Sequence, residues 1–448
     1  MQAPKLKIHF IGIGGIGVSA LAKYYIEKGC KISGSDLVRS EITDALKKNG
    51  AKIRTGKPVE ACPKQADLVV YSPAVQENNR ELKAARKAGI KCLSYPQALG
   101  ELTRQHYTIA VSGTHGKSTT TAMLALLLVK AGLDPTVIVG TKLKEFGDSN
   151  CRVGKSGYLV IEADEHFASL LNYWPKIIIL TNIEEDHLDY YKNLKNILKT
   201  FKKYISHLPK DGILVANKDD KNIRKIICSG ESSTVFYSLR QAAAKKLKGI
   251  LKVPGEHNIY NAMGALTAAR ILKIPDKVSF KALSEYKGAW RRFETKQTVW
   301  NKKQITLISD YGHHPTKVRV TLKATREKYP KKKIWCVYQP HQYQRTYYLF
   351  KDFVKVFRAA PVDEIIITDI FDVAGREEKQ IKKKVSSEKL VRAIKKKSVI
   401  YLPKEKILNY LKENLGSGEV LIIMGAGDIY KLVDSFNLTK KKNRKKIN

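Results

Sequence analysis

Residues 108–121 read TIAVSGTHGKSTTT, and this stretch decides how the chain around it is expected to fold. An apolar run with strand character, Ile109 to Val111, leads into a glycine-containing loop, and an apolar helical pattern, Met123 to Val129, follows at once. Glycines let the backbone N–H groups of such a loop converge on phosphate oxygens, and the start of the following helix favours negative charge. The stretch therefore predicts a phosphate-binding loop between a strand and a helix.

The loop also carries the side chains that phosphate chemistry needs. Lys117 is placed to reach the outer phosphates of a nucleotide, and the Ser118 hydroxyl is placed to ligate Mg²⁺. Two residues separate the loop glycines here, whereas the common form of the motif has four. A glycine turn that merely caps a helix is the alternative, which the combination of strand, loop, lysine and hydroxyl disfavours. The candidate phosphate-binding residues are Gly113, Thr114, His115, Gly116, Lys117, Ser118 and Thr119.

Length and composition bound the class of protein. A chain of 448 residues is too long for one ordinary domain, and 43% hydrophobic residues with a mean hydropathy of -0.31 are typical of a soluble globular protein. The chain holds no run of about eighteen apolar residues and no signal-peptide pattern, so we expect a cytoplasmic protein without membrane insertion. The six cysteines stand far apart, which argues against a disulfide framework and against a zinc site.

The basic charge balance raises the question of a polyanionic partner. The chain has 82 Lys and Arg against 42 Asp and Glu, a formal net charge of +40, and residues 440–446 form a basic run near its end. The basic runs lack the interleaved aromatic residues on which bases stack. We therefore favour a lysine-rich solvated surface and expect no nucleic-acid partner, with a nucleic-acid-binding NTPase as the alternative.

A glycine-rich turn near the start predicts a second nucleotide site. KLKIHFIG alternates as a strand does, GIGGIG follows, and a helix is expected from Val18 to Glu27. Asp36 ends the next strand about twenty positions later, as in folds that hold a diphosphate at a helix N-terminus. A nicotinamide cofactor is the first ligand to consider for such a site. Ser72 lies at a further strand end, where a plain turn is an equal alternative. The candidate residues are Gly12, Gly14, Gly15, Gly17, Asp36 and Ser72.

Two strands after the phosphate loop end in polar residues. YLVIEADE and KIIILTNIEEDH place Glu162 and His187 after consecutive strands, and ligand sites of parallel sheets lie outside such strand ends. We therefore expect both side chains to converge on the loop, although each alone could be a surface charge or a cap. A carboxylate and an imidazole beside the Ser118 hydroxyl, with no cysteine, favour Mg²⁺ over Zn²⁺.

Polar side chains downstream extend the candidate set. A helix is expected from about Ile259 to Leu272, and Asn258 and Asn261 are able to read an adenine edge, with helix capping by Asn258 as an equal explanation. Arg291 and Arg292 suit a phosphate clamp. From near residue 295 another alternation of strands and helices predicts a wound parallel sheet. Its strand ends carry Asp310, Tyr311, His313, His314, His341 and Arg345.

Together these motifs resemble the Mur ligases, ATP-dependent amide-bond-forming enzymes of peptidoglycan precursor synthesis. The similar stretches follow the family's order along nearly the whole chain: GIGGIG with SGSD, GTHGKSTT, EADE, TNIEEDH, HNIYN, RRFE, DYGHHPTKV, QPHQYQRT and MGAGD. DYGHHP and QPHQYQRT are similar to the branch that adds L-alanine, more than to branches that add later residues or recycle tripeptide. The resemblance implies UDP-N-acetylmuramate, L-alanine and ATP as substrates, and a UDP-sugar instead of a nicotinamide cofactor in the first domain.

The resemblance also implies roles for single residues. It assigns ATP contacts to Lys117, Asn258, Asn261, Arg292 and Asp310, and the metal to Ser118, Glu162 and His187. It places His341 and Arg345 where the incoming amino acid binds, so the expected catalytic set is Lys117, Glu162, His187, Arg292, His341 and Arg345. Ser118 replaces the threonine usual in the family but keeps its hydroxyl, and Gln342 stands where a basic residue is common.

We therefore expect an α/β protein of three domains. Residues 1–105 are expected to form a Rossmann-like UDP-sugar-binding domain, and residues 106–294 a central ATP-binding domain of the P-loop ATPase kind. Residues 295–448 are expected to form a Rossmann-like domain that receives the amino acid and carries the basic tail. Because the substrates come from different domains, closure on binding is expected.

Overall fold

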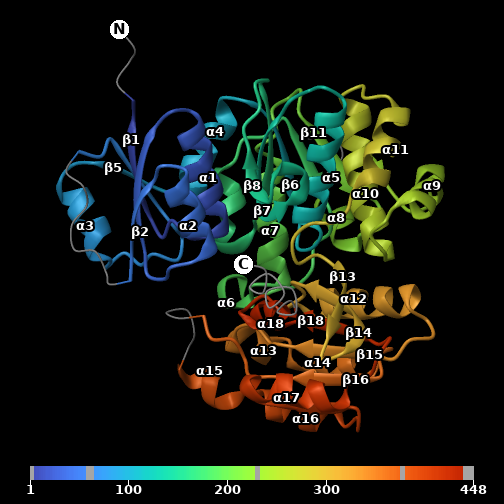
Figure 1. Cartoon of the computed structure of the whole chain (residues 1–448). Helices are drawn as coiled ribbons and strands as arrows, with labels where there is room; N and C mark the ends of the chain where they lie inside the picture. The colour runs from blue at the N-terminus through green and yellow to red at the C-terminus, as the bar shows by residue number, and fades with distance from the viewer. Residues whose placement is uncertain (1–4, 57–64, 228–232, 374–378, 437–448) are drawn as a thin grey trace, which may run out of the picture. The chain divides into compact units, whose positions relative to one another are not determined.

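The computed structural model describes residues 5–56, 65–227, 233–373 and 379–436, so the basic run at 440–446 lies outside the described residues (Figure 1). The chain forms two compact units. The first comprises residues 1–184, 195–251 and 259–286, and the second comprises residues 185–194, 252–258 and 287–448. The described parts contain three separate sheets with helices between their strands, which confirms the predicted α/β class. None of the described helices has the length and apolar character needed to cross a lipid bilayer.

The first sheet belongs to the first unit and is parallel throughout, with strand order β3-β2-β1-β4-β5. Its strands are β1 (Lys7–Ile11), β2 (Lys31–Asp36), β3 (Lys52–Thr55), β4 (Leu68–Tyr71) and β5 (Lys91–Ser94), and its helices are α1 (Ile16–Glu27), α2 (Glu41–Lys48), α3 (Arg80–Lys87) and α4 (Tyr95–Arg104). Ile11 lies opposite Ser35 on one side and Tyr71 on the other. The carboxyl ends of β1, β2 and β4 therefore meet at one edge.

The second sheet, also in the first unit, has the order β12-β11-β10-β6-β9-β7-β8 and is parallel except for β8. Its strands are β6 (Tyr107–Ser112), β7 (Thr136–Leu143), β8 (Ser149–Arg152), β9 (Tyr158–Ala163), β10 (Ile177–Leu180), β11 (Ile213–Asn217) and β12 (Ser233–Tyr237). The strand before the phosphate loop, β6, lies between β9 and β10, and Ser112 pairs with Ala163 and with Leu180. The loop therefore leaves the sheet between the two strand ends that carry polar residues.

Helices cover this second sheet. They are α5 (Lys117–Lys130), α7 (Leu194–Ile205), α8 (Lys221–Ile226), α9 (Ala242–Ile250), α10 (Glu256–Ile271) and α11 (Asp276–Glu285). The 3-10 segments η1 (Lys144–Phe146) and η2 (His166–Asn172) connect β7 to β8 and β9 to β10. Helix α5 is buried on nearly every side because its residues 118–128 are small or apolar. Helix α10 begins about one turn before the predicted start at Ile259. Asn258 therefore lies inside the helix, and the alternative explanation that it caps the helix is wrong.

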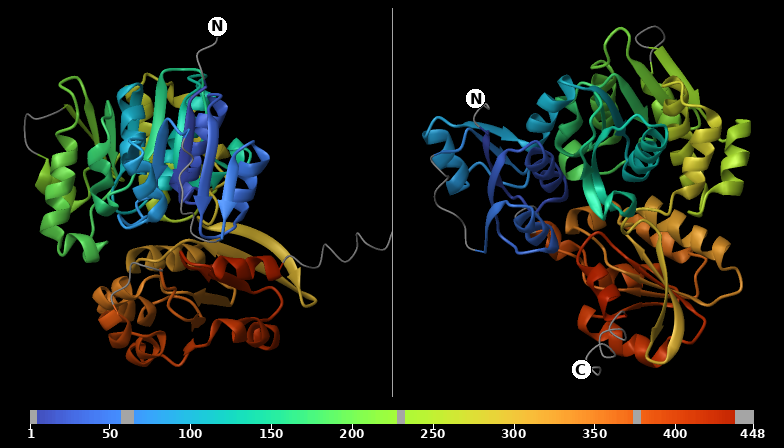
Figure 2. Two further views of the ribbon diagram at one scale, coloured as in Figure 1. Left: turned by 90° about the vertical axis from the view of Figure 1, so that its left-hand side faces the viewer. Right: turned by 45° about the horizontal axis from the view of Figure 1, so that its top comes forward.

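The third sheet belongs to the second unit and has the order β13-β14-β18-β15-β16-β17. Its strands are β13 (Glu294–Trp300), β14 (Lys303–Asp310), β15 (Ile334–Tyr338), β16 (Glu364–Ile367), β17 (Val399–Tyr401) and β18 (Val420–Met424). All neighbours are parallel except β13 and β14, a hairpin coloured yellow to orange in both views of Figure 2. The sequence pattern did not predict β13, because most of its side chains are exposed or half-buried and no apolar alternation marks it.

Both faces of the third sheet are buried, because neighbouring residues of each strand point to opposite sides. Ile308, Cys336 and Ile422 pack into one core cluster, and Leu307, Val337 and Ile423 into another. The covering helices are α6 (Leu188–Tyr191), α12 (Pro315–Lys328), α13 (Tyr343–Tyr348), α14 (Phe350–Arg358), α15 (Lys379–Lys384), α16 (Ser387–Ile394), α17 (Ile407–Asn414) and α18 (Leu432–Ser435), with the short segments η3 (Lys404–Lys406) and η4 (Ile429–Lys431).

Candidate active site

The phosphate loop is a tight turn whose glycines are required by their surroundings. Gly113 has a φ of +129°, and a Cβ there would lie 2.2 Å from the Thr181 hydroxyl oxygen. Gly116 has a φ of +84° and precedes the first residue of α5, and a Cβ on it would lie 2.2 Å from Asn261 Oδ1. Only a residue without a side chain fits at either place. The loop therefore presents its backbone at the N-terminal end of α5, the arrangement that suits an anion.

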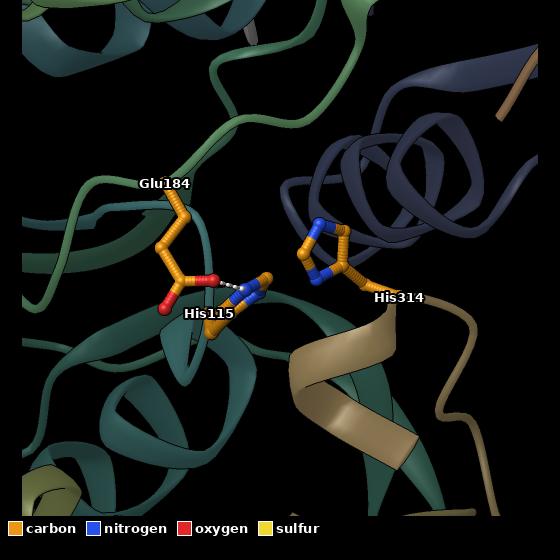
Figure 3. Close-up of side chains that lie close together, drawn as sticks. All are labelled: His115, Glu184 and His314. Carbon is orange, nitrogen blue, oxygen red and sulfur yellow. Dashed lines mark hydrogen bonds and ion pairs between the residues drawn. The ribbon is translucent and has the colours of Figure 1, made fainter. Parts of the chain in front are cut away.

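The end of β10 braces this loop through side chains that sequence reasoning missed. Asn182 Oδ1 accepts a hydrogen bond from the His115 N–H at 2.9 Å, and the Thr181 hydroxyl donates to the His115 carbonyl at 2.7 Å. Glu184 pairs with His115 as well, at 3.2 Å between Oε2 and Nε2 (Figure 3). The TNIE stretch after the β10 strand contained this signal, because polar residues after a parallel strand end face its neighbours.

Lys117 is buried beside carboxylates. Its ammonium donates to the Gly113 carbonyl at 2.7 Å and pairs with Glu165 at 2.5 Å, with Asp164 at 3.4 Å. Burial by itself would lower the pKa of Lys117, but the charges of Glu165, Asp164 and Glu162 outweigh burial and hold this pKa above its ordinary value. Lys117 is therefore a fixed cation at the loop. Sequence reasoning did not single out Glu165, although it lies in the EADE motif.

Glu162 and Ser118 come together at the carboxyl end of β9. The Ser118 hydroxyl donates to Glu162 Oε1 at 2.9 Å, and Glu162 Oε2 accepts a hydrogen bond from the Gly140 N–H at 2.8 Å. A hydroxyl oxygen and a carboxylate oxygen at this spacing are hard ligands of the kind that Mg²⁺ prefers. The pair fits such an ion. The third predicted ligand, His187, belongs to the second unit, so its convergence with Glu162 stays a prediction.

The two asparagines of the HNIYN motif both lie on α10 but make different contacts. Asn261 Oδ1 accepts a hydrogen bond from the buried Thr120 hydroxyl at 3.3 Å and lies against Gly116 of the phosphate loop. Asn258 Nδ2 donates to the Pro254 carbonyl at 2.7 Å. Their predicted contacts with adenine stay predictions.

The glycine turn of the first sheet brings its six predicted residues to one edge. The N–H groups of Gly12 and Ile13 donate to the Ser35 carbonyl at 2.8 and 3.1 Å, and the Gly14 N–H donates to the Asp36 carboxylate at 2.8 Å. Gly12 has a φ of +76°, and a Cβ there would lie 2.9 Å from the Ser72 Cβ. Gly15 precedes α1, and Gly17 lies within it against the ring of Tyr95. The turn therefore offers a small concave backbone at a helix N-terminus, which suits a diphosphate.

The second unit holds a buried ion pair between Asp186 and Arg345. Arg345 Nε donates to Asp186 Oδ1 at 3.0 Å, and the two side chains are 6% and 3% exposed. Arg345 Nη1 donates to Gln342 Oε1 at 2.7 Å and lies 3.2 Å from His341 Nδ1. Burial alone would raise the pKa of the Asp186 carboxyl, but Arg345 and the neighbouring His187 hold it well below its usual range. Asp186 and Gln342 thus hold the guanidinium of Arg345 in place.

A cavity adjoins this pair. Its lining is Asp186, His187, Leu188, Asp189, Gln342, Arg345, Tyr348 and Leu349. Nη2 of Arg345 makes no hydrogen bond to any residue that the structure describes. His341 stacks on Phe371 at 5.5 Å between ring centroids. The cavity therefore lies beside a buried cation, which suits a carboxylate.

The paired arginines of the second unit lie in different surroundings. Arg291 is buried, lies over the rings of Tyr311 and Tyr430 at 4.8 and 4.3 Å, and donates to the Gly425 carbonyl. Arg292 also lies over the Tyr311 ring, at 4.8 Å from its centroid.

Asp310 is buried and bonded within the chain. Its carboxylate accepts hydrogen bonds from the N–H groups of Phe293 and Gly312, at 2.9 and 2.8 Å, and from the Thr321 hydroxyl at 3.3 Å. Burial raises the pKa of Asp310. In this arrangement Asp310 fixes the turn that carries the arginines, and its predicted contact with the nucleotide stays a prediction.

The fold described above is that of an ATP-dependent ligase family, and the chain belongs to the Mur ligase family. Three family models match it: "Mur ligase family, catalytic domain" at residues 7–107, "Mur ligase middle domain" at residues 111–269, and "Mur ligase, glutamate ligase domain" at residues 291–427. This confirms the predicted resemblance.

Individual relatives indicate which enzymes of the family this chain is similar to. The chain is 41% identical to the UDP-N-acetylmuramate--L-alanine ligase of Clostridium acetobutylicum, over 96% of this chain and 97% of that protein. It is 39% identical to the enzyme of the same name from Caldanaerobacter subterraneus, over 97% and 98%. The crystal structure of UDP-N-acetylmuramate-alanine ligase from Thermotoga maritima is similar to it, with a TM-score of 0.79, 26% identity, and coverage of 98% of this chain and 100% of that one.

Proposed function

We propose that this chain joins L-alanine to the lactyl carboxylate of UDP-N-acetylmuramate, with conversion of ATP to ADP and phosphate, in peptidoglycan precursor synthesis. The observation that carries the proposal is identity of about 40% to ligases of that name over nearly the whole chain. The phosphate loop with Lys117 and the cavity beside Arg345 support it, because a ligase of this kind needs a nucleotide site and a site for a small amino acid. We expect the reaction to take place in the cytoplasm.

The reaction requires activation of a carboxylate. A carboxylate resists attack by an amine because its negative charge repels the nucleophile. Transfer of the γ-phosphoryl group of ATP to the sugar's carboxylate gives an acyl phosphate and ADP. The amine of L-alanine then attacks the acyl carbon, phosphate leaves and the amine loses a proton, which forms the amide bond. Positioning and charge stabilisation account for the catalysis, and no covalent enzyme intermediate is needed.

We propose that residues of the second sheet handle the ATP phosphates. Residues 113–119 hold the phosphates with backbone N–H groups, and the ammonium of Lys117 offsets their charge. Ser118 and Glu162, with His187 as the third predicted ligand, would hold Mg²⁺, which when bound supplies further neutralisation of phosphate charge. Arg292 adds a second cation for the transferred group.

We propose that the amino acid binds beside Arg345. Asp186 and Gln342 fix the guanidinium, so its Nη2 is available to pair with the carboxylate of L-alanine. His341 lies next to that cation, where it is placed to contact the amino acid.

The other substrate and the domain division complete the proposal. The glycine turn that ends β1, together with Asp36 and Ser72, binds the UDP part of the sugar nucleotide. Residues 1–105 thus bind the sugar nucleotide, residues 106–294 bind ATP, and residues 295–448 bind the amino acid.

A phosphate-release assay tests the proposal. Purified full-length chain is mixed with ATP, Mg²⁺ and UDP-N-acetylmuramate, and each amino acid is added in turn, with the tripeptide of recycling ligases as a further acceptor. L-alanine is expected to give phosphate and a product heavier by one alanyl residue. Absence of ADP with L-alanine, glycine and L-serine would show that the proposal is wrong, and turnover with the tripeptide alone would assign the chain to the recycling branch.

A substitution in the phosphate loop distinguishes the proposed ATP site from the proposed UDP-sugar site. Lys117→Ala is expected to abolish phosphate release, because the remaining loop has no other side-chain cation at the phosphates. Binding of UDP-N-acetylmuramate is expected to stay close to that of the wild type, because its proposed site is in the first sheet. Turnover by Lys117→Ala would contradict the assignment of the loop.

A further inference from the structure

Glu165 lies where the phosphates of a nucleotide are expected to meet Lys117. The Glu165 and Lys117 side chains are 4% and 11% exposed, and 2.5 Å separates Oε2 from Nζ. The other carboxylate near this ammonium, Asp164, is 3.4 Å away and 54% exposed. Burial raises the pKa of the Glu165 carboxyl and the charge of Lys117 lowers it. Because solvent screens Asp164 and not Glu165, Glu165 is the nearer and less screened acidic partner of Lys117.

The backbone around Glu165 fixes its position. Phe167 and Ala168 both have a φ of +53°, a disfavoured conformation for residues with a side chain, and two such residues in succession persist only where their surroundings impose it. The Ala168 N–H donates to the Glu165 carbonyl at 2.8 Å, and the Leu170 N–H donates to the Asp164 carbonyl at 3.0 Å. A strained, hydrogen-bonded turn therefore holds this carboxylate beside the loop.

Oxygen atoms of the chain already contact the ammonium of Lys117. Its N–H groups donate to the carbonyl of Gly113 and to the carboxylate of Glu165, and the carboxylate of Asp164 lies 3.4 Å away. A phosphate oxygen that binds Lys117 must approach the ammonium that the Glu165 carboxylate already contacts at 2.5 Å. Like charges that share one ammonium repel, so nucleotide binding works against this carboxylate.

We propose that Glu165 is a positioning residue that occupies Lys117 in the nucleotide-free enzyme as an internal substitute for phosphate, and that its charge weakens the binding of ATP and ADP and promotes the release of ADP. The inference rests on the proposed function, because it takes Lys117 as the lysine that contacts the phosphates. This role of Glu165 differs from a purely structural role in the sign of its effect on nucleotide affinity. A carboxylate that only supports the fold leaves affinity unchanged or lowers it when removed, whereas a competing anion raises affinity when removed.

Nucleotide binding to the full-length chain tests the inference without turnover. Titration calorimetry with ADP and Mg²⁺ compares the wild type, Glu165→Gln and the matched control Asp164→Asn, which removes the same charge from the same turn at the more exposed position. Glu165→Gln is expected to lower the Kd for ADP roughly tenfold, the ratio that corresponds to about 1.4 kcal/mol. Asp164→Asn is expected to lower it no more than about threefold, because solvent screens that group.

A second readout uses turnover. If Glu165 promotes ADP release, Glu165→Gln is expected to lower the KM for ATP while the KM for L-alanine stays unchanged. Thermal unfolding of each variant checks that it is folded, and Glu165→Ala is measured in the same way where Glu165→Gln gives no folded protein.

The outcomes separate this inference from the proposed function. An equal or higher Kd for ADP in folded Glu165→Gln, with normal binding by the wild type and loss of binding in Lys117→Ala, would overturn the role of Glu165 alone. An equal gain in Asp164→Asn and Glu165→Gln would also overturn it, because the effect would then be one of general charge. Failure of the wild type to bind ADP at all would overturn both the inference and the assignment of the phosphate loop.

Discussion

Removal of the charge of Asp186 is expected to destabilise the second unit strongly. Asp186 and Arg345 form an ion pair of 3.0 Å whose side chains are 3% and 6% exposed. In Asp186→Asn the guanidinium keeps the neutral oxygen of Gln342 but loses its only anionic partner at contact distance among the described residues. A buried cation without a counter-charge is costly, because water no longer solvates it and nothing replaces the water.

The magnitude follows from the geometry. Loss of one partner of a buried pair costs about 3–5 kcal/mol, and the lower end applies here because Gln342 still accepts one hydrogen bond. We therefore expect Asp186→Asn to lower the free energy of unfolding of the second unit by about 3 kcal/mol. Domains are stable by only about 5–15 kcal/mol, so this is a large share of the total.

Urea unfolding followed by tryptophan fluorescence measures the effect. Trp290, Trp300 and Trp335 lie in the second unit, and Trp174 lies in the first, so a Trp174→Phe background makes the signal report the second unit. The matched control is Asp352→Asn. Asp352 pairs with Lys355 at 3.9 Å, and their side chains are 55% and 78% exposed. Removal of such an exposed pair is expected to leave the urea midpoint unchanged.

Two results would refute the reasoning. One is a midpoint for Asp186→Asn equal to that of Asp352→Asn, which would mean that the pair contributes nothing despite its burial. The other is a shift of the unfolding transition that appears only when Trp174 is present and not in the Trp174→Phe background, which would place the effect in the first unit.

Three further expectations concern glycine positions and pH. Gly113→Ala is expected to abolish ADP binding in calorimetry, because the φ of +129° and a 2.2 Å approach exclude a Cβ, whereas Gly157→Ala, where no atom lies within 4 Å, is expected to bind normally. Gly12→Ala is expected to raise the KM for UDP-N-acetylmuramate and to leave the Kd for ADP unchanged, since its Cβ would lie 2.9 Å from Ser72 Cβ; equal losses for both ligands would contradict separate sites. Burial, together with the charges of Lys317 and Arg345, holds the pKa of His313 in the folded protein well below its usual value. As the pH falls, the unfolded chain therefore binds a proton at this histidine before the folded protein does, and the free energy of unfolding is expected to decrease below about pH 6.5. In urea titrations from pH 8 to 5, the free energy of unfolding of His313→Asn is expected to decrease less than that of the wild type. Equal decreases in the two proteins would refute this expectation.

The sequence alone determined the fold class and the family. Glycine turns between a strand and a helix are local features, so residues 12–17 and 113–119 predicted two nucleotide-type turns without any tertiary information. The alternation of strands and helices predicted wound parallel sheets, and the order of the motifs indicated the Mur ligases, which the comparisons confirm. Each of these signals depends on residues near one another in the chain.

The tertiary structure decided which side chains meet. Glu165 lies 48 positions after Lys117, and Asp186 lies 159 positions before Arg345, and neither spacing follows a helical or strand period. Packing also set the start of α10 at Glu256 and added β13, whose exposed residues carry no apolar pattern. The physical reason is that a buried charge is tolerable only beside its counter-charge, and the chain satisfies this condition through its path in space.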